Sequence, residues 1–421
     1  MGSDTAAMVN EAPSTSLQPS LSQRLWELAK IFLKLGVIGF GGPQAHIAMQ
    51  NDEVVVRRNW LTPEQFTEGL AVCEMLPGPA STQLGIYIGY MRAGQLGALV
   101  AGLCFIAPAF LIVLALSWGY FKFQGTPQVE GLFLGISPVV AAIILAFCWK
   151  LGKKTLKDWP RGVIAIAVFL ITTLSTLNVL IQFIAAGLAG LWLYRPHRAD
   201  RSPPSQLNGW FLPPLPLLLA NAPAETLTLS GFWGLERIGE LSLPLLLFFL
   251  KVGSFIFGGG LVIIPLLEFE VVDKLGWLTR SEFINGVAIG QLSPGPVVLA
   301  AAFVGYKAAG VLGALIASVG IFTPSFGFIM LAAPLLLQIR QSPWVRAFLQ
   351  GVTPAVLGAI AAAAAPLLQT ALAQANLFHS IAAGLIGCGA LVAILRYRLP
   401  TWKLVPLGGL LGLLVSLAPI T

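Results

Sequence analysis

Charged residues are scarce in this chain. Asp, Glu, Lys and Arg make up only 10% of its 421 residues, whereas hydrophobic residues make up 56% and the mean hydropathy is +0.82. A soluble domain carries about 25% charged residues, so a soluble globular protein is excluded. Apolar runs of about 20 residues, long enough to cross the ~30 Å hydrocarbon core of a bilayer, recur along most of the sequence. These features predict an all-α polytopic membrane protein embedded in the lipid bilayer.

Histidine and cysteine are also rare, and the motifs of enzymes are missing. The three histidines lie far apart, and the four cysteines occur singly in apolar segments without C-x-x-C spacing. The sequence holds no H-E-x-x-H, G-x-S-x-G or Walker motif, and its glycines lack the strand–turn–helix context of a dinucleotide site. We therefore expect no metal, no cofactor, no catalytic residue and no ATP hydrolysis by the chain itself.

The N-terminal segment does not have the pattern of a signal peptide. Residues 1–23 are polar, carry Asp4 and Glu11, and do not place an apolar run after a basic one. We expect them to form a disordered cytoplasmic tail. The net charge of +7 arises from basic residues in short loops between apolar segments, where Lys and Arg orient membrane proteins. The charge therefore does not predict nucleic-acid binding.

The most informative feature that is present is an internal repeat. Residues 32–79 align without a gap on residues 249–296, and 20 of the 48 aligned positions are identical. The shared positions are mostly glycines, prolines and aromatic residues, together with one lysine and one glutamate. A duplicated unit in so apolar a chain is typical of a secondary transporter.

The repeat divides the chain into a tail and two halves joined by a linker. The first repeat covers residues 24–194, the linker 195–240 and the second repeat 241–421. Loop charges favour inverted repeats, because only then do the basic loops of both halves face the cytoplasm. Inversion needs an odd number of crossings in the linker, and the apolar segment 210–222 is the candidate for an extra membrane segment. A parallel arrangement of the repeats is the alternative.

The predicted topology has about 13 transmembrane segments and a cytoplasmic N-terminus. Residues 66–90 and 283–305 are expected to be single spans. Residues 162–194 are long enough for two short spans that meet near Asn178.

Helix-breaking residues recur at equivalent positions of both repeats. A break within the membrane leaves free N–H groups at the N-terminus of a half-helix, which suits an oxyanion. Close helix packing is the alternative explanation for such glycines. Hydroxyl groups follow the first Pro-Gly-Pro triplet, whereas valines follow the second, so the first half-site is the more polar. The predicted anion-binding residues at these breaks are Gly39, Gly41, Gly42, Pro43, Pro77, Gly78, Pro79, Ser81, Thr82, Gly258, Gly259, Pro294, Gly295 and Pro296.

Charged and titratable residues near the breaks are further candidates. Lys34 and Lys251 occupy equivalent positions of the repeat; each either binds the anion or extends its side chain to the membrane surface. Glu74, which is Gln291 in the second repeat, is a candidate for proton coupling. His46 is a second candidate for coupling, with a hydrogen-bonded structural histidine as the alternative.

The paired motifs resemble those of a known family. Phe-Gly-Gly-Pro at 40–43, Trp60-Leu61 and Leu-Pro-Gly-Pro at 76–79, with weaker copies in the second half, are similar to the chromate ion transporter family in its long two-domain form. The resemblance covers the chain from about residue 24 onward. It implies a multi-pass carrier in the bacterial inner membrane that exports chromate and confers chromate resistance. The copies differ at Pro43/Gly260 and Glu74/Gln291, so binding of the ion by both halves stays open.

Two other functions are weighed beside chromate transport. Sulfate is also a tetrahedral dianion that the same donors would accept, and nothing in the sequence separates the two substrates. A membrane-embedded chromate reductase is the other alternative, and the missing cofactor motifs argue against it. Export needs no ATP, since a dianion that leaves an inside-negative cell gains about 4.6 kcal/mol per 100 mV. Anion exchange, proton coupling and association into a homodimer stay open.

Overall fold

The computed structural model describes residues 20–175, 177–194, 231–256, 260–332, 342–374 and 376–418. All regular elements in these ranges are helices, and the ranges contain no strand, so the predicted all-α class is confirmed. Most of the predicted tail and linker, including the apolar segment 210–222, lies outside the described residues, as do Gly258 and Gly259.

The two repeats have the same order of helices, where η marks a short π- or 3₁₀-helix. The first repeat comprises α1 (Leu21–Ile38), α2 (Pro43–Asn51), η1 (Asp52–Arg57), α3 (Pro63–Cys73), α4 (Ala80–Phe123), α5 (Pro127–Thr155), α6 (Trp159–Leu174) and α7 (Val179–Leu193). The second comprises α8 (Leu235–Ser254), η3 (Gly260–Val262), α9 (Ile263–Leu267), η4 (Glu268–Lys274), α10 (Arg280–Leu292), η5 (Val297–Leu299), α11 (Ala300–Ala332), α13 (Pro343–Leu372), α14 (Leu377–Leu395) and α15 (Thr401–Ser416).

Each Pro-Gly-Pro triplet lies at the turn of a helical hairpin. Gly69 of α3 contacts the ring of Tyr87 in α4, although ~27 Å of continuous helix would otherwise separate them. Gly286 of α10 contacts Phe303 of α11 in the same way. The chain therefore folds back at residues 77–79, which we call tip 1, and at residues 294–296, which we call tip 2. The sequence predicts one span near 66–90 and one near 283–305, each interrupted at its triplet. The predicted interruptions are confirmed, but the chain folds back at each of them, because the prolines and the flexible glycine end one helix and start another.

A second break divides each long helix after the hairpin. The backbone of α4 leaves the helical region at Ala93 and Gly94, and α11 does so at the equivalent Ala309 and Gly310. Gly94 has a φ of 62° and Gly310 a φ of 55°, a conformation that glycine adopts without strain. The remainder of each helix then runs back along the hairpin.

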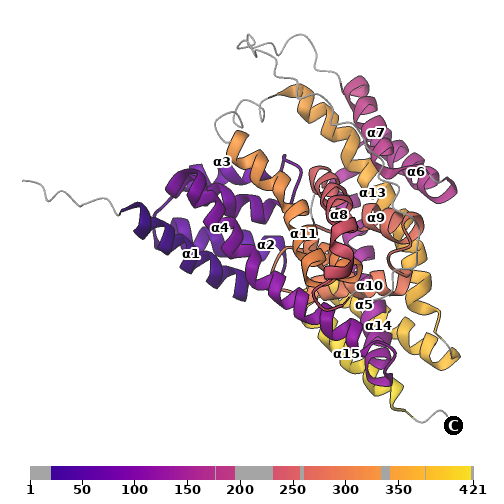
Figure 1. Cartoon of the computed structure of the whole chain (residues 1–421). Helices are drawn as coiled ribbons and strands as arrows, with labels where there is room; N and C mark the ends of the chain where they lie inside the picture. Colours follow the sequence, from indigo (N-terminus) through magenta and orange to yellow (C-terminus); the bar gives the residue numbers. More distant parts are fainter. Residues whose placement is uncertain are drawn as a thin grey trace, which may run out of the picture.

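The last three helices of each repeat form a scaffold, in which the first of these helices in one repeat packs against the other two of the opposite repeat. Helix α5 packs against α14 and α15, while its equivalent α13 packs against α6 and α7 (Figure 1). Glycines make both contacts close: a methyl group on Gly135 would collide with the backbone of Gly408, and one on Gly351 with the backbone of Ala186. Such small-residue contacts are typical of helices in membranes. Two short helices, α6 and α7, occupy most of residues 162–194, and Asn178 caps α7. That each of them spans the membrane stays a prediction.

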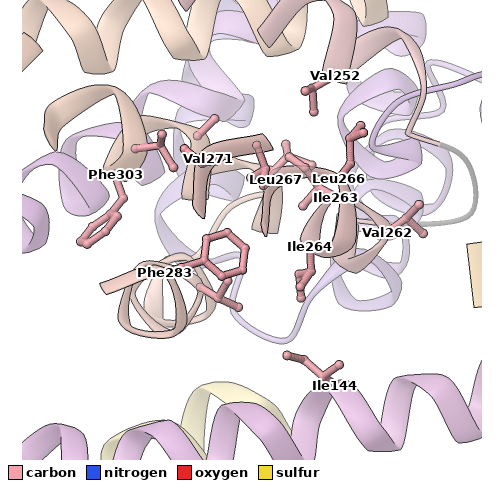
Figure 2. Close-up of a cluster of buried hydrophobic side chains, with 14 of the residues drawn as sticks. Ile144, Val252, Val262, Ile263, Ile264, Leu266, Leu267, Val271, Phe283 and Phe303 are labelled. Carbon is pink, nitrogen blue, oxygen red and sulfur yellow. The ribbon is translucent and has the colours of Figure 1, made fainter. Parts of the chain in front are cut away.

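The helices before the scaffold are packed differently in the two repeats. We call residues 21–92 module 1 and residues 235–308 module 2. In module 2, α10 packs against α5, α13 and α15, and all residues from Phe283 to Gln291 are buried. Figure 2 shows the side chains of α9 and η4 gathered between Val252 of α8 and Ile144 of α5. Module 2 is therefore docked on the scaffold.

Module 1 is not docked on the scaffold in this way, and its Phe40 packs against Trp402 of α15 (ring centroids 5.6 Å apart). Its α3 packs mainly against α4 and leaves Glu64, Thr67 and Glu68 exposed. Its apolar side chains form a core of their own, which extends from Leu28 to Phe105 and includes Ile329 of the second repeat. Figure 1 shows α1 to α3 at one end of the molecule, apart from α6, α7 and α13. The symmetric scaffold thus carries two modules in unequal positions.

Five of the described helices are long and apolar enough to cross a membrane. They are α4, α5, the segment Val297–Leu331 that contains α11, α13 and α14. The helices α6, α7 and α15 are apolar but shorter. Several apolar helices in one chain indicate a membrane-embedded protein, whereas the total of about 13 segments stays a prediction.

The exchange of partners in the scaffold generates a prediction about stability. We expect Gly135→Val to lower the free energy of unfolding by about 3 kcal/mol, because the new side chain meets backbone that cannot move aside. Gly384→Val in α14 is the matched control, since a Cβ there meets open space. Thermal unfolding of the detergent-purified variants measures both effects. Equal melting temperatures for the two variants would contradict the described packing.

Candidate functional site

The broken helix ends of the two repeats meet one another. The Gly78 N–H of tip 1 donates to the Ile256 carbonyl of the second repeat (2.7 Å). His46 Nε2 lies 2.5 Å from the Gly39 carbonyl and 3.1 Å from the Pro294 carbonyl of tip 2. Gly39 and Ile256 are equivalent positions of the two repeats. Tip 1 contacts Ile256 of the second repeat, and tip 2 lies beside Gly39 of the first, so the two tips make contacts at equivalent places. Such reciprocal contacts are what a two-fold relation between the repeats requires.

His46 is the side chain that joins tip 2 to the first repeat. It is 1% exposed, and its Nδ1 lies 3.2 Å from the Ser81 hydroxyl. Both carbonyls near Nε2 are acceptors, so Nε2 carries a hydrogen and Nδ1 of a neutral ring accepts from Ser81. The neutral ring therefore satisfies all three contacts. This geometry gives His46 a structural task, while its predicted role in coupling stays a prediction.

Tip 1 leads into the N-terminus of α4, which has no side-chain cap. Ser81, Thr82 and Gln83 in the first turn are each 0–1% exposed. Gln83 Nε2 donates to the Pro77 carbonyl (2.7 Å), which fixes the turn, and Gly78 has a φ of 131°. The free N–H groups of this first turn and the neighbouring hydroxyls present positive dipole ends to the centre of the molecule.

Tip 2 has a different chemical character. The residues after it, Val297 to Leu299, form a short apolar 3₁₀ turn. Ser293, just before the tip, donates its hydroxyl hydrogen to the Gly290 carbonyl (2.9 Å). Donors for an anion therefore gather at tip 1, in line with the expectation that the first half-site is the more polar.

The glycines of the first break form the turn that precedes α2. Gly41 and Gly42 have φ values of 118° and 80°, and Pro43 stands in the first turn of the helix. Gly39 is buried beside Pro294, whereas Gly41 is exposed. The structure thus brings Gly39 close to tip 2 and leaves Gly41 farther from it.

The two repeat lysines are engaged in ion pairs. Lys251 Nζ donates to Glu270 Oε1 (2.8 Å), and Lys34 donates to Glu53 in the equivalent pair. Glu270 also accepts from Asn178 of α7 (3.0 Å), whereas the pair in module 1 borders a pocket of about 380 Å³. Both glutamates are nearly buried, so each lysine neutralises a carboxylate that would otherwise be costly.

Glu74, its counterpart Gln291 and the unpredicted Ser325 are the remaining polar residues near the tips. Glu74 is exposed at the end of α3, while Gln291 is buried with no partner for its Nε2. Ser325, from α11, lies against Gly78 of tip 1 and was not predicted. Its signal in the sequence was the alignment of Pro324 with Pro108, which pairs Ser325 with Ala109. Within the described residues, no group of three or more His, Cys, Asp or Glu side chains could hold a metal ion.

Comparison with known proteins finds one family in both halves. The family model described as chromate transporter matches residues 26–191 and 243–413. No solved structure matches the chain.

Several curated proteins are similar over most of the chain. The chromate transport protein of Cupriavidus metallidurans is 35% identical over 365 residues, which cover 85% of this chain and 84% of the relative. The probable chromate transport protein of Synechococcus elongatus is 33% identical over 402 residues, covering 95% and 94%. The chromate transport protein of Pseudomonas aeruginosa is 32% identical over 370 residues, covering 85% and 84%.

The ion pair in module 2 generates a stability prediction. We expect Lys251→Gln to lower the free energy of unfolding by about 1–3 kcal/mol, because it weakens the charge compensation of the nearly buried Glu270. The double variant Lys251→Gln/Glu270→Gln removes both charges, and we expect it to recover most of that loss. Thermal unfolding of the purified variants measures both. A single variant as stable as the unmodified chain would show that the pair does not stabilise the fold.

Proposed function

Since this chain belongs to the chromate transporter family, we propose that it carries chromate out of the cytoplasm and thereby confers chromate resistance. Three curated relatives more than 30% identical over at least 84% of their length are named as chromate transport proteins, one of them as probable. The geometry that carries the proposal is the meeting of broken helices from both repeats at tip 1 and tip 2. Half-helix ends inside a bundle of apolar helices are typical of ion sites in secondary transporters. The proposed protein is a carrier and not an enzyme.

The anion site that we propose lies between the two repeats. Tip 1 and the first turn of α4 supply N–H groups and hydroxyls, and Gly39 with Pro43 and tip 2 complete the surroundings. The predicted contributions of Gly258 and Gly259 fall outside the described residues. The predicted binding of the anion by Lys34 and Lys251 is not part of this proposal, because each lysine is paired with a nearly buried glutamate.

The contacts between equivalent helices support inverted repeats. Gly102 of α4 contacts Phe326 of α11, whereas the equivalent of Gly102 in the second repeat is Ser318. Parallel helices related by a two-fold axis would touch at equal heights. The observed contact is displaced by eight residues, or ~12 Å along the helix, as expected of an antiparallel pair. We therefore propose opposite orientations of the two halves, with the N-terminus in the cytoplasm of a bacterial cell and the chain in its inner membrane.

The unequal docking of the modules supports transport by alternating access. In module 2, Asn285 Oδ1 accepts from Ser137 Oγ of α5 (3.2 Å). The equivalent pair is Glu68 of the first repeat, which is exposed, and Thr353 of α13 in the second repeat. In our proposal module 1 docks through this pair when module 2 undocks, and the exchange opens the site to the other side of the membrane.

The energy source in the proposal is the membrane potential. An inside-negative potential of 100 mV favours the export of a dianion by about 4.6 kcal/mol. Proton coupling through Glu74 and exchange for another anion are the alternatives. Sulfate is the alternative substrate, because hydrogen-bond donors at tip 1 recognise tetrahedral dianions of either kind.

Uptake of labelled chromate into everted membrane vesicles tests the function. We expect accumulation that increases with an inside-positive potential, up to ~10³-fold at 100 mV for a uniporter. The chromium should be recovered as chromate, since a reductase would release a reduced product. Uptake that low concentrations of sulfate abolish would favour the sulfate transporter, and uptake independent of potential would favour electroneutral exchange. Vesicles without the protein are the control.

Pairs of introduced cysteines test alternating access. In a background without Cys73, Cys104, Cys148 and Cys388, the pair Ser137→Cys/Asn285→Cys should cross-link in the resting protein. The pair Glu68→Cys/Thr353→Cys should cross-link only during turnover, because that contact belongs to the other state. Either cross-link should stop transport by at least tenfold, and reduction should restore it. Normal transport with no cross-link ever formed by the second pair would refute the exchange of docked modules.

A further inference from the structure

Two polar side chains from different repeats meet at the glycine of tip 1. A methyl group on Gly78 would collide with the Ser325 hydroxyl of α11 and come within 2.5 Å of Gln83 Nε2. Ser325 therefore lies against the backbone of tip 1, although it belongs to the second repeat. Gly78 is required there both by this close approach and by its positive φ.

Three polar atoms around tip 1 have no hydrogen-bond partner. They are the hydroxyl oxygens of Thr82 and Ser325 and the side-chain oxygen of Gln83, and all three residues are 0% exposed. Leaving a buried polar group unsatisfied costs about 1–3 kcal/mol, so the two hydroxyls call for an acceptor, while the Gln83 oxygen, itself an acceptor, calls for a donor such as water. The cluster adjoins the uncapped N-terminus of α4, whose dipole favours a negative charge.

The equivalent place at tip 2 is apolar. A methyl group on Gly295 would meet Ala109 Cβ and Leu299 Cδ1. Ala109 is the counterpart of Ser325 and Leu299 the counterpart of Gln83 when the helices after the tips are aligned. The two tips thus share their backbone fold and differ in the side chains that face the glycine.

From this contrast, and resting on the proposed transport function, we propose that each chain binds a single tetrahedral oxyanion, at tip 1. The hydroxyls of Thr82 and Ser325 donate to the anion together with the first N–H groups of α4. Gln83 is a positioning residue, because its amide holds the Pro77 carbonyl and fixes the turn. Tip 2 closes the other side of the site and binds no second ion.

The site needs both repeats, which distinguishes it from a half-site repeated twice. Ser325 reaches tip 1 only while α11 lies against it, so a movement of the modules changes the number of donors. In this proposal the affinity for an anion therefore depends on whether α11 lies against tip 1.

Binding of radiolabelled chromate to the purified full chain by equilibrium dialysis tests the proposal. We expect one anion per chain and an increase in Kd of about tenfold or more for Ser325→Ala, since a hydrogen bond to a charged group is lost. Ser325→Thr retains the hydroxyl and should lose less affinity than Ser325→Ala. The matched control is Ala109→Ser at tip 2, which should leave both the stoichiometry and Kd unchanged. Thermal unfolding of each variant shows whether it is folded.

The outcomes separate this proposal from the function on which it rests. Chromate bound with a stoichiometry of two, or with an affinity that Ser325→Ala does not change, overturns the single site and leaves chromate transport standing. If only sulfate or molybdate binds, once per chain and weakened by Ser325→Ala, the site stands and the chromate function fails. If none of these anions binds to the folded protein, both are overturned.

Discussion

A break in an apolar helix leaves backbone N–H and C=O groups that must find partners, because the hydrocarbon region offers no bulk water. The chain satisfies several of these groups by bringing breaks from different repeats together. Gly78 donates to the Ile256 carbonyl, and His46 donates to the carbonyls of Gly39 and Pro294. Each repeat thus completes the backbone of the other. The halves are bound to each other at the same place where the helix ends can receive an ion.

The scaffold and the modules satisfy their backbone N–H and C=O groups in different ways. In the scaffold, glycines such as Gly135 and Gly351 let continuous helices from opposite repeats pack closely, and the contacts are reciprocal. In the modules the helices are broken, and the two copies are packed differently although their internal hairpins are alike. A duplicated chain can hold one symmetric frame and two unequal modules because each module has short, internally satisfied hairpins that move as units. The asymmetry therefore reflects position and not a difference in fold.

The sequence was sufficient for the membrane class, the positions of the breaks and the division of residues 162–194 near Asn178, because each depends on local chemistry. It could not distinguish a hairpin from a span at residues 66–90, since both have the same length and hydropathy. The partner of Lys34 was also hidden: Glu53 lies 19 residues away and approaches only when the chain folds back. Ser325 reaches Gly78 from the other repeat, and no local pattern specifies such a contact. The sequence therefore predicted the kinds of segment correctly, but it did not show which segments contact one another in the fold.

The way in which charge is held explains why this arrangement suits a carrier. A carrier must bind its ion and also release it, so moderate affinity is required. Lys34 and Lys251 are each compensated by a glutamate of their own module, and Glu53 and Glu270 each contact a second cation as well. At tip 1 the donors are hydroxyls and the N-terminus of α4, which carries a partial charge of about +0.5. In a low dielectric, a full cation beside a dianion would hold it too strongly for rapid release. A site built from dipoles, with ion-paired charges around it, therefore suits a protein that releases its ion better than one that retains it.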